Sequence, residues 1–150
     1  MAGGASTSGA PNTTLHASCV SYLDTGVLIC GASGNGKSSL ALQLMAFGAI
    51  LVADDRTILT AHQGILTAQA PPAIAGLIEA RGVGVLQAET LPSVRVSLVI
   101  DLDHTETTRL PCLRNASVLG ICVPSLHKVE SSAFPAAILQ YVKAGRRDPS

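Results

Sequence analysis

Residues 27–39 have the sequence VLICGASGNGKSS, in which Gly31–Ser38 matches the pattern G-x-x-x-x-G-K-[ST] at every fixed position. The apolar run before the loop predicts a buried strand, and the helix formers of 38–47, which stop at Gly48, predict a helix after it. Glycines let consecutive backbone N–H groups converge on an anion, and the N-terminus of a helix adds positive dipole character there. The stretch therefore predicts a phosphate-binding loop. Its residues are Gly31, Ala32, Ser33, Gly34, Asn35, Gly36, Lys37, Ser38 and Ser39.

Two further features beside this loop indicate phosphoryl transfer from ATP. Lys37 is expected to reach the β- and γ-phosphates, and the Ser38 hydroxyl is expected to bind Mg²⁺. Asp54 and Asp55 end the apolar run 49–53, which follows the predicted helix. In a parallel α/β layer that strand end lies at the same edge as the loop, so one carboxylate can hold Mg²⁺ and the other can accept a proton. The alternative is that the two aspartates only form a turn and have no role in catalysis.

A third segment, IEARGVGV at 78–85, carries a weaker signal. Glu79 and Arg81 are two residues apart, so they share one face of an extended chain. Glu79 could be a second metal ligand and Arg81 could stabilise charge on the transferred phosphoryl group, although an exposed ion pair beside a bulge has the same pattern. His16 lies in the predicted strand 15–22, where an isolated histidine is more often structural. His62, His104 and His127 receive no functional interpretation.

Composition excludes several classes of protein. Ten basic and ten acidic residues give a net charge of zero, which argues against nucleic-acid binding and against a polybasic membrane-surface protein. Apolar residues make up 47% of the chain, yet no apolar run approaches the roughly 18 residues that span a bilayer. The four cysteines lack the spacing of metal ligands and are expected to be buried, reduced thiols. We therefore expect a cytoplasmic protein.

The remaining apolar segments predict a mixed α/β architecture. The strands 15–22 and 27–30 form one predicted hairpin, and 56–60 with 65–69 form a second. Further strands are predicted at 94–102 and 118–123, and a last helix reaches Lys143 with Pro135 in its first turn. The expected fold is an α/β, P-loop kinase-like domain over 14–144, with a mixed sheet containing two hairpins and flanking helices. Flexible tails are predicted at 1–13 and 145–150.

Four features in this order resemble the HPr kinase/phosphorylase family of bacteria. They are His16 before the loop, GASGNGKSS at 31–39, LVADDR at 51–56 and IEARGVGVL at 78–86, and together they cover roughly 15–90. The resemblance implies a serine kinase that uses ATP and Mg²⁺ to phosphorylate the phosphocarrier protein HPr, with dephosphorylation as a second activity. The chain resembles a short form of the family, reduced to the catalytic domain, and the family's hexamers imply a homo-oligomer.

The resemblance also implies roles for individual residues. Asp55 matches the family's proton-transferring acid, and His16 a histidine that assists it. Ser38 and Glu79 match the Mg²⁺ ligands, and Lys37 the phosphate-binding lysine. It also favours a functional segment around Arg81, whereas the family's later P-x-x-G-R-N loop, associated with dephosphorylation, has no match here. Candidates for the family's later active-site arginine are Arg95, Arg109 and Arg114. The alternatives are a kinase for a small metabolite, an ATPase, or a nucleotide-sensing module without catalysis.

Overall fold

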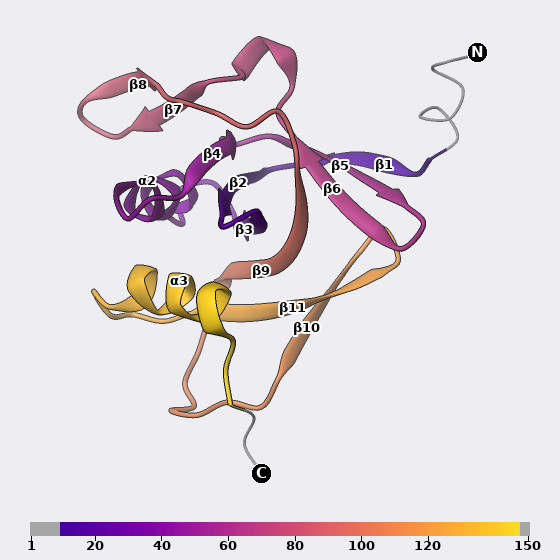
Figure 1. Cartoon of the computed structure of the whole chain (residues 1–150). Coiled ribbons are helices and arrows are strands. Elements are labelled where there is room, and N and C mark those ends of the chain that lie inside the picture. Colours follow the sequence, from indigo (N-terminus) through magenta and orange to yellow (C-terminus); the bar gives the residue numbers. More distant parts are fainter. Residues whose placement is uncertain (1–9, 148–150) are drawn as a thin grey trace.

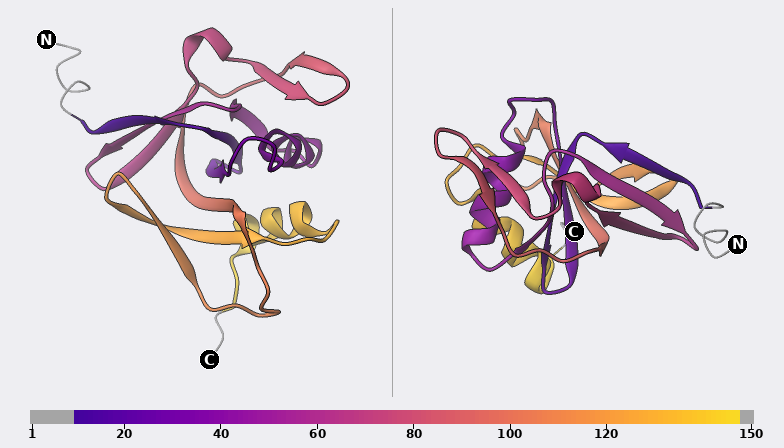
Figure 2. Two further views of the ribbon diagram at one scale, coloured as in Figure 1. Left: turned by 180° about the vertical axis from the view of Figure 1, so that it is seen from behind. Right: turned by 90° about the horizontal axis from the view of Figure 1, so that it is seen from above.

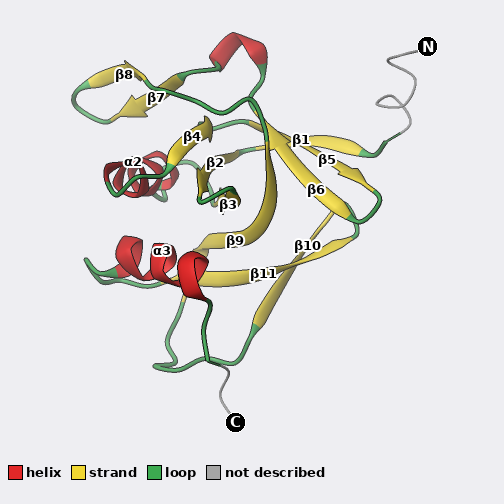
Figure 3. Ribbon diagram, in the orientation of Figure 1, coloured by secondary structure: helices red, strands yellow, loops and turns green. Residues whose placement is uncertain are grey.

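The computed structural model describes residues 10–147, which form a strongly bent sheet with two α-helices packed against it (Figure 1). Figure 3 distinguishes the helices, strands and connecting loops. The elements of the first half are β1 (Asn12–Leu15), β2 (Ala17–Tyr22), β3 (Thr25–Cys30), α2 (Lys37–Ala46), β4 (Ile50–Ala53), β5 (Thr57–His62) and β6 (Ile65–Gln69). Those of the second half are the 3₁₀ turn η1 (Pro72–Ile74), β7 (Leu77–Ala80), β8 (Gly84–Gln87), β9 (Val94–Thr105), β10 (Arg114–Val118), β11 (Ile121–Lys128) and α3 (Phe134–Ala144).

The order of the strands brings three strand ends to the edge of the sheet where the P-loop lies. The main path is β1-β5-β6-β9-β3-β2-β4, and β11 pairs with both β9 and β10. β2 is antiparallel to β3 and to β4, so β3 and β4 run in the same direction. β9 is parallel to β3 and to β11. The carboxyl ends of β3, β4 and β9 therefore lie at one edge, as is usual for ligand sites in α/β sheets.

Apolar side chains form a separate core on each face of the central strands. On one face Ile29 and Ile100 pack with Leu44 of α2 and Ile138 of α3. On the other face the side chains of β3 and β9 pack against those of β5, β6 and β11, with fully buried Leu28 among them. Figure 2 shows both helices on one side of the central strands and the hairpins β5–β6 and β10–β11 on the other. Strands of the same sheet thus cover its second face, so two helices on the first face are enough to bury the apolar side chains of the central strands.

The two predicted hairpins are confirmed as β2–β3 and β5–β6, and Pro135 lies in the first turn of α3 as expected. The prediction of one strand over 118–123 is wrong. Leu119 and Gly120 form a turn with φ values of 50° and 79°, and the strands on either side pair as the hairpin β10–β11. Positive φ at both central residues is the geometry of a tight hairpin turn. A fourth hairpin, β7–β8, was also not predicted.

The predicted boundaries of the tails differ from the structure. Asn12 and Thr13 lie in β1, which pairs with β5, so the strand predicted to begin at Leu15 starts earlier and is interrupted at His16. The polar composition of NTTL concealed this edge strand, although Thr suits a half-exposed strand well. At the other end Arg146 donates a hydrogen bond to the Pro111 carbonyl at 2.8 Å, so it is held against the domain. The outer parts of the two predicted tails, 1–9 and 148–150, lie outside the described residues.

No helix within residues 10–147 is long and apolar enough to cross a membrane.

The expectation that all four cysteines are buried is wrong for two of them. Cys19 is buried and Cys30 partly so, whereas Cys112 and Cys122 are exposed.

Candidate active site

The glycine-rich loop between β3 and α2 keeps its backbone accessible. Gly34 and Gly36 have φ values of 89° and 95°, a conformation that is strained for residues with a Cβ. No atom lies within 4 Å of where a Cβ would stand at either glycine, so the requirement is conformational and not one of space. Gly36 is also the N-cap of α2, with no side chain covering the helix end. The free N–H groups of the first helical turn can therefore bind an anion.

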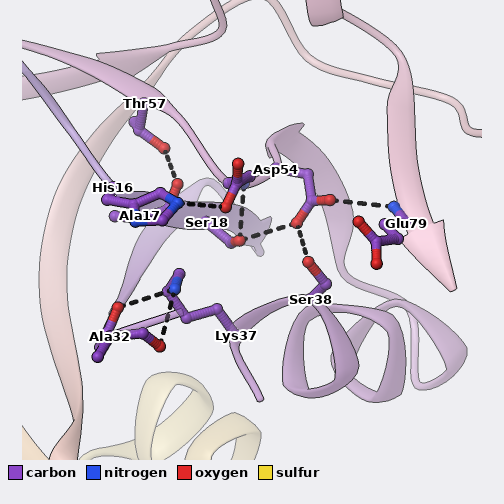
Figure 4. Close-up of polar contacts among 11 residues, drawn as sticks. His16, Ala17, Ser18, Ala32, Lys37, Ser38, Asp54, Thr57 and Glu79 are labelled. Atoms are coloured by element: carbon purple, nitrogen blue, oxygen red, sulfur yellow. Dashed lines mark hydrogen bonds and ion pairs between the residues drawn. The ribbon is translucent and has the colours of Figure 1, made fainter. Parts of the chain in front are cut away.

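Lys37 is buried, and its ammonium group lies on the loop itself. Its Nζ donates to the carbonyl oxygens of Gly31 and Ala32 at 2.8 and 3.2 Å (Figure 4). These bonds hold the positive charge next to the backbone N–H groups of the loop. The same side chain lines the pocket described below, so it can neutralise phosphate charge there.

Asp54 is the buried carboxylate that connects the loop to its neighbours. Its Oδ1 accepts hydrogen bonds from Ser38 Oγ at 2.6 Å and from Ser18 Oγ at 2.9 Å, and its Oδ2 accepts one from the backbone N–H of Glu79 at 3.0 Å (Figure 4). These contacts join β2, α2 and β7 at one point. Because the Ser38 hydroxyl donates its hydrogen to Asp54, its oxygen lone pairs remain for a cation.

Asp55 is held in a different environment from Asp54. Its side chain is about half exposed, and its Oδ1 lies 2.7 Å from Nε2 of His16. Its backbone N–H donates to Ser18 Oγ at 3.1 Å, and its φ of 68° is in the left-handed region. Thr57 Oγ1 bonds the Ala17 carbonyl and fixes the chain beside His16. A carboxylate that faces a pocket and is oriented by a histidine can accept a proton from a bound hydroxyl.

A pocket of about 200 Å³ gathers most of these groups. Every residue lining it is one that the sequence singled out. The lining residues are Ser33, Gly34, Gly36, Lys37, Ser38, Ser39, Asp55, Glu79 and Arg81. The turn after β7 carries Arg81, so hairpin β7–β8 brings Glu79 and Arg81 to the P-loop although they are distant from it in the chain. The predicted residues outside the lining are His16, Gly31, Ala32, Asn35 and Asp54.

Sequence analysis missed two residues that hold this site together. Ser18 is buried on β2 and hydrogen-bonded to both aspartates of the pair, by its hydroxyl to Asp54 and from the Asp55 N–H. A serine within the apolar run of a buried strand was the available signal, because buried hydroxyls require partners.

The second missed residue is Asp103, near the end of β9. Its Oδ1 accepts hydrogen bonds from the Ala32 N–H at 2.9 Å and from Asn35 Nδ2. The bond from the Ala32 N–H, more than any other contact, lowers the pKa of the Asp103 carboxyl below its usual value. An acid at the carboxyl end of a strand parallel to β3 was the signal here, but the pairing of the two strands cannot be read from the local sequence.

The candidates for a later active-site arginine lie elsewhere. Arg114 Nε is 2.9 Å from Oε1 of Glu106, which follows the end of β9, and Arg109 lines a separate cavity of about 530 Å³ beside α3. Arg95 faces Thr67 across the β9–β6 pair. Arg81 is the arginine that lines the P-loop pocket among the described residues.

A glycine loop that opens at a helix N-terminus, with carboxylates from neighbouring strands facing it, defines a P-loop kinase-like domain. Comparison with known sequences then identifies the family within this class of proteins. Residues 7–125 match the HPr Serine kinase C-terminal domain, and the chain belongs to this family.

Individual relatives agree with this assignment. The chain is 40% identical over 130 residues to the HPr kinase/phosphorylase of Caldicellulosiruptor bescii, across 78% of this chain and 42% of the relative. It is 43% identical over 102 residues to that of a Geobacillus species, across 63% and 33%. The solved Hpr(Ser) kinase/phosphatase from Coxiella burnetii superposes with a TM-score of 0.74 at 27% identity, over 87% of this chain and 94% of that one. The chain thus spans less than half the length of these curated relatives, and the predicted family and fold class are confirmed.

Proposed function

We propose that this chain transfers the γ-phosphoryl group of ATP to a serine hydroxyl of the phosphocarrier protein HPr, with Mg²⁺ as cofactor. The observation that carries the proposal is that Asp55, paired with His16, faces the same pocket as the P-loop. A nucleotide-binding module has no need of an oriented carboxylate there. Membership of the HPr serine kinase family supports HPr as the acceptor.

In the proposed reaction Asp55 accepts the proton of the serine hydroxyl while the serine oxygen attacks the γ-phosphorus. The bond between this phosphorus and the bridging oxygen breaks, and ADP leaves. His16, 2.7 Å from Asp55, orients the carboxylate and stabilises its charge when protonated itself. In the reverse direction we propose that ADP attacks the phosphoserine phosphorus and the bond from this phosphorus to the serine oxygen breaks. A protonated Asp55 gives its proton to that oxygen, and ATP forms.

The other residues of the pocket bind and orient the phosphates. Gly34, Gly36 and Lys37–Ser39 line the pocket and would donate their N–H groups to the phosphate chain, and Lys37 would add positive charge as negative charge develops on the phosphoryl oxygens. Arg81 approaches the same oxygens from β7–β8. Ser38 and Glu79 would hold Mg²⁺, with Asp54 orienting the Ser38 hydroxyl and reaching the ion directly or through water. When bound, Mg²⁺ neutralises phosphate charge.

The test is incubation with Mg²⁺-ATP and purified HPr, followed by the intact mass of HPr. We expect one added phosphate on serine with the wild-type chain and none with Asp55→Asn. Asp24→Asn is the matched control, because Asp24 is exposed, has a φ of 62° and lies in the distant β2–β3 turn. ATP hydrolysis without transfer would indicate an ATPase or another acceptor, and ATP binding without turnover would indicate a sensing module.

We also propose that the chain acts as a homo-oligomer, on the basis of its resemblance to hexameric family members. Light scattering after size-exclusion chromatography tests this directly. A mass that is a multiple of 15.3 kDa is expected, with six copies as the family's arrangement. A monomer at micromolar concentration would contradict the proposal.

A further inference from the structure

A second group of polar side chains lies at the carboxyl ends of β9 and β11, separate from the aspartate pair. Asp101 and His127 are direct partners in the parallel register of these strands, so their side chains emerge on the same face of the sheet. His104 follows on β9, three residues after Asp101. One ligand atom from each of the three residues lies within 4.8 Å of the others.

The contacts within this group draw the three side chains together. Nδ1 of His104 is 2.8 Å from Oδ2 of Asp101. The imidazole rings of His104 and His127 stack, with their centroids 5.3 Å apart and their planes 27° from parallel. The side chain of His104 is 68% exposed and that of Asp101 is 29% exposed, so an ion can reach the group from solvent.

We propose that Asp101, His104 and His127 bind a divalent transition-metal ion of the zinc type. Two imidazole nitrogens and one carboxylate oxygen form a donor set that suits Zn²⁺, Co²⁺ and Ni²⁺, whereas Mg²⁺ and Ca²⁺ select oxygen donors. Ligand atoms about 2.1 Å from a tetrahedral zinc ion are roughly 3.4 Å apart, so small rotations of the side chains suffice to close the site. The solvent-exposed side leaves a fourth position for water.

This site is distinct from the Mg²⁺ position proposed at Ser38 and Glu79, and it does not depend on the proposed kinase activity. It nevertheless contacts the P-loop through one residue. The Asp103 N–H donates to Oδ1 of Asp101 at 2.9 Å, and Oδ1 of Asp103 accepts from the Ala32 N–H at 2.9 Å. An ion on Asp101 would therefore lie two hydrogen bonds away from the backbone of the glycine-rich loop at Ala32.

The test is titration of the full chain with Co²⁺ in excess Mg²⁺, followed by visible absorption, because four-coordinate Co²⁺ absorbs far more strongly than the hydrated ion. We expect one equivalent to bind the wild-type chain and Zn²⁺ to displace it. The variant His104→Gln/His127→Gln should lose the signal. His104 is exposed and His127 is partly buried, and neither belongs to a hydrophobic core, so this variant should fold normally, as circular dichroism would verify.

Two control variants separate this site from other metal-binding groups. His62→Gln removes an exposed histidine at the end of β5 and should keep the signal. Cys112→Ser/Cys122→Ser removes the exposed thiols and should also keep it. The proposal is overturned if the wild-type chain gives no signal at micromolar Co²⁺, if His104→Gln/His127→Gln retains it, or if either control variant loses it.

Discussion

At the scale of single residues, Asp55 combines the side chain that we propose as the proton acceptor with an uncommon backbone conformation. Its φ of 68° is tolerated by Asp and Asn, but it costs about 1–2 kcal/mol for most other L-residues. We therefore predict that Asp55→Ala lowers the free energy of unfolding by about 1–2 kcal/mol more than Asp55→Asn does. Urea unfolding of both variants measures this difference. Equal stabilities would show that the backbone at this position relaxes freely.

Lys37 permits a second prediction at this scale, because its ammonium group lies on the loop that we propose binds phosphate. Lys37→Ala removes the charge and both of its hydrogen bonds to Gly31 and Ala32. We expect a loss of at least about 100-fold in kcat, the usual cost of removing one donor to developing charge, together with weaker nucleotide binding. Transfer assays and calorimetric ATP titration measure the two effects. Lys143→Ala, at the exposed end of α3, is the matched control and should behave as wild type.

At the scale of elements, the end of β9 supports the P-loop through Asp103. Asp103→Ala removes the acceptor for the Ala32 N–H and for Asn35, so the loop should become less ordered before nucleotide binds. We predict roughly tenfold weaker ATP binding, in line with losing hydrogen bonds to a charged group, and little change in unfolding, since Asp103 is exposed. Calorimetric titration measures the effect on ATP affinity, and urea unfolding measures the effect on stability. A large loss of stability with unchanged affinity would contradict a role in ordering the loop.

Glu106 and Arg114 connect the segment after β9 to β10, and their pairing predicts a dependence of stability on pH. Hydrogen bonding from Arg114 lowers the pKa of Glu106 from its usual 4.5 to about 2. A lowered pKa means that the pair stabilises the folded state above about pH 4.5 and loses this contribution as the pH falls towards 2. Glu106→Gln should reduce stability at neutral pH and flatten the curve in this range. Urea unfolding from pH 7 to pH 2.5 measures this, and parallel curves for both proteins would contradict it.

The elements that the sequence predicted well are those with local signals. The strand, glycine loop and helix at 27–47 follow from apolar runs, helix formers and glycines that are adjacent in the chain. The hairpin β10–β11 was missed because its turn uses Leu119 before Gly120, and leucine is an unusual residue at positive φ. Ser18 and Asp103 were missed because their importance depends on which strands pair, and strand pairing is not a local property.

At the scale of the whole molecule, β9 joins the two cores. It pairs with β6 near its start and with β3 and β11 further on. Its side chains enter both cores: Val96 and Val99 lie in the core under the hairpins, and Ile100 lies in the core under the helices. No part of the sheet between residues 10 and 147 has a core that excludes this strand. We therefore expect the domain to unfold as one cooperative unit.

Ile100 tests this expectation, because it is fully buried on β9 in the core that also contains residues of α2 and α3. Ile100→Ala should cost about 2–5 kcal/mol and lower the midpoint of the whole transition. Far-UV circular dichroism and the fluorescence of Tyr22 and Tyr141, measured at one protein concentration, should give the same midpoint. Ile65→Ala is the matched control, since Ile65 is 40% exposed at the start of β6 and should cost less than about 0.5–1 kcal/mol. Different midpoints for the two probes would mean that the two cores unfold separately and that β9 does not couple them.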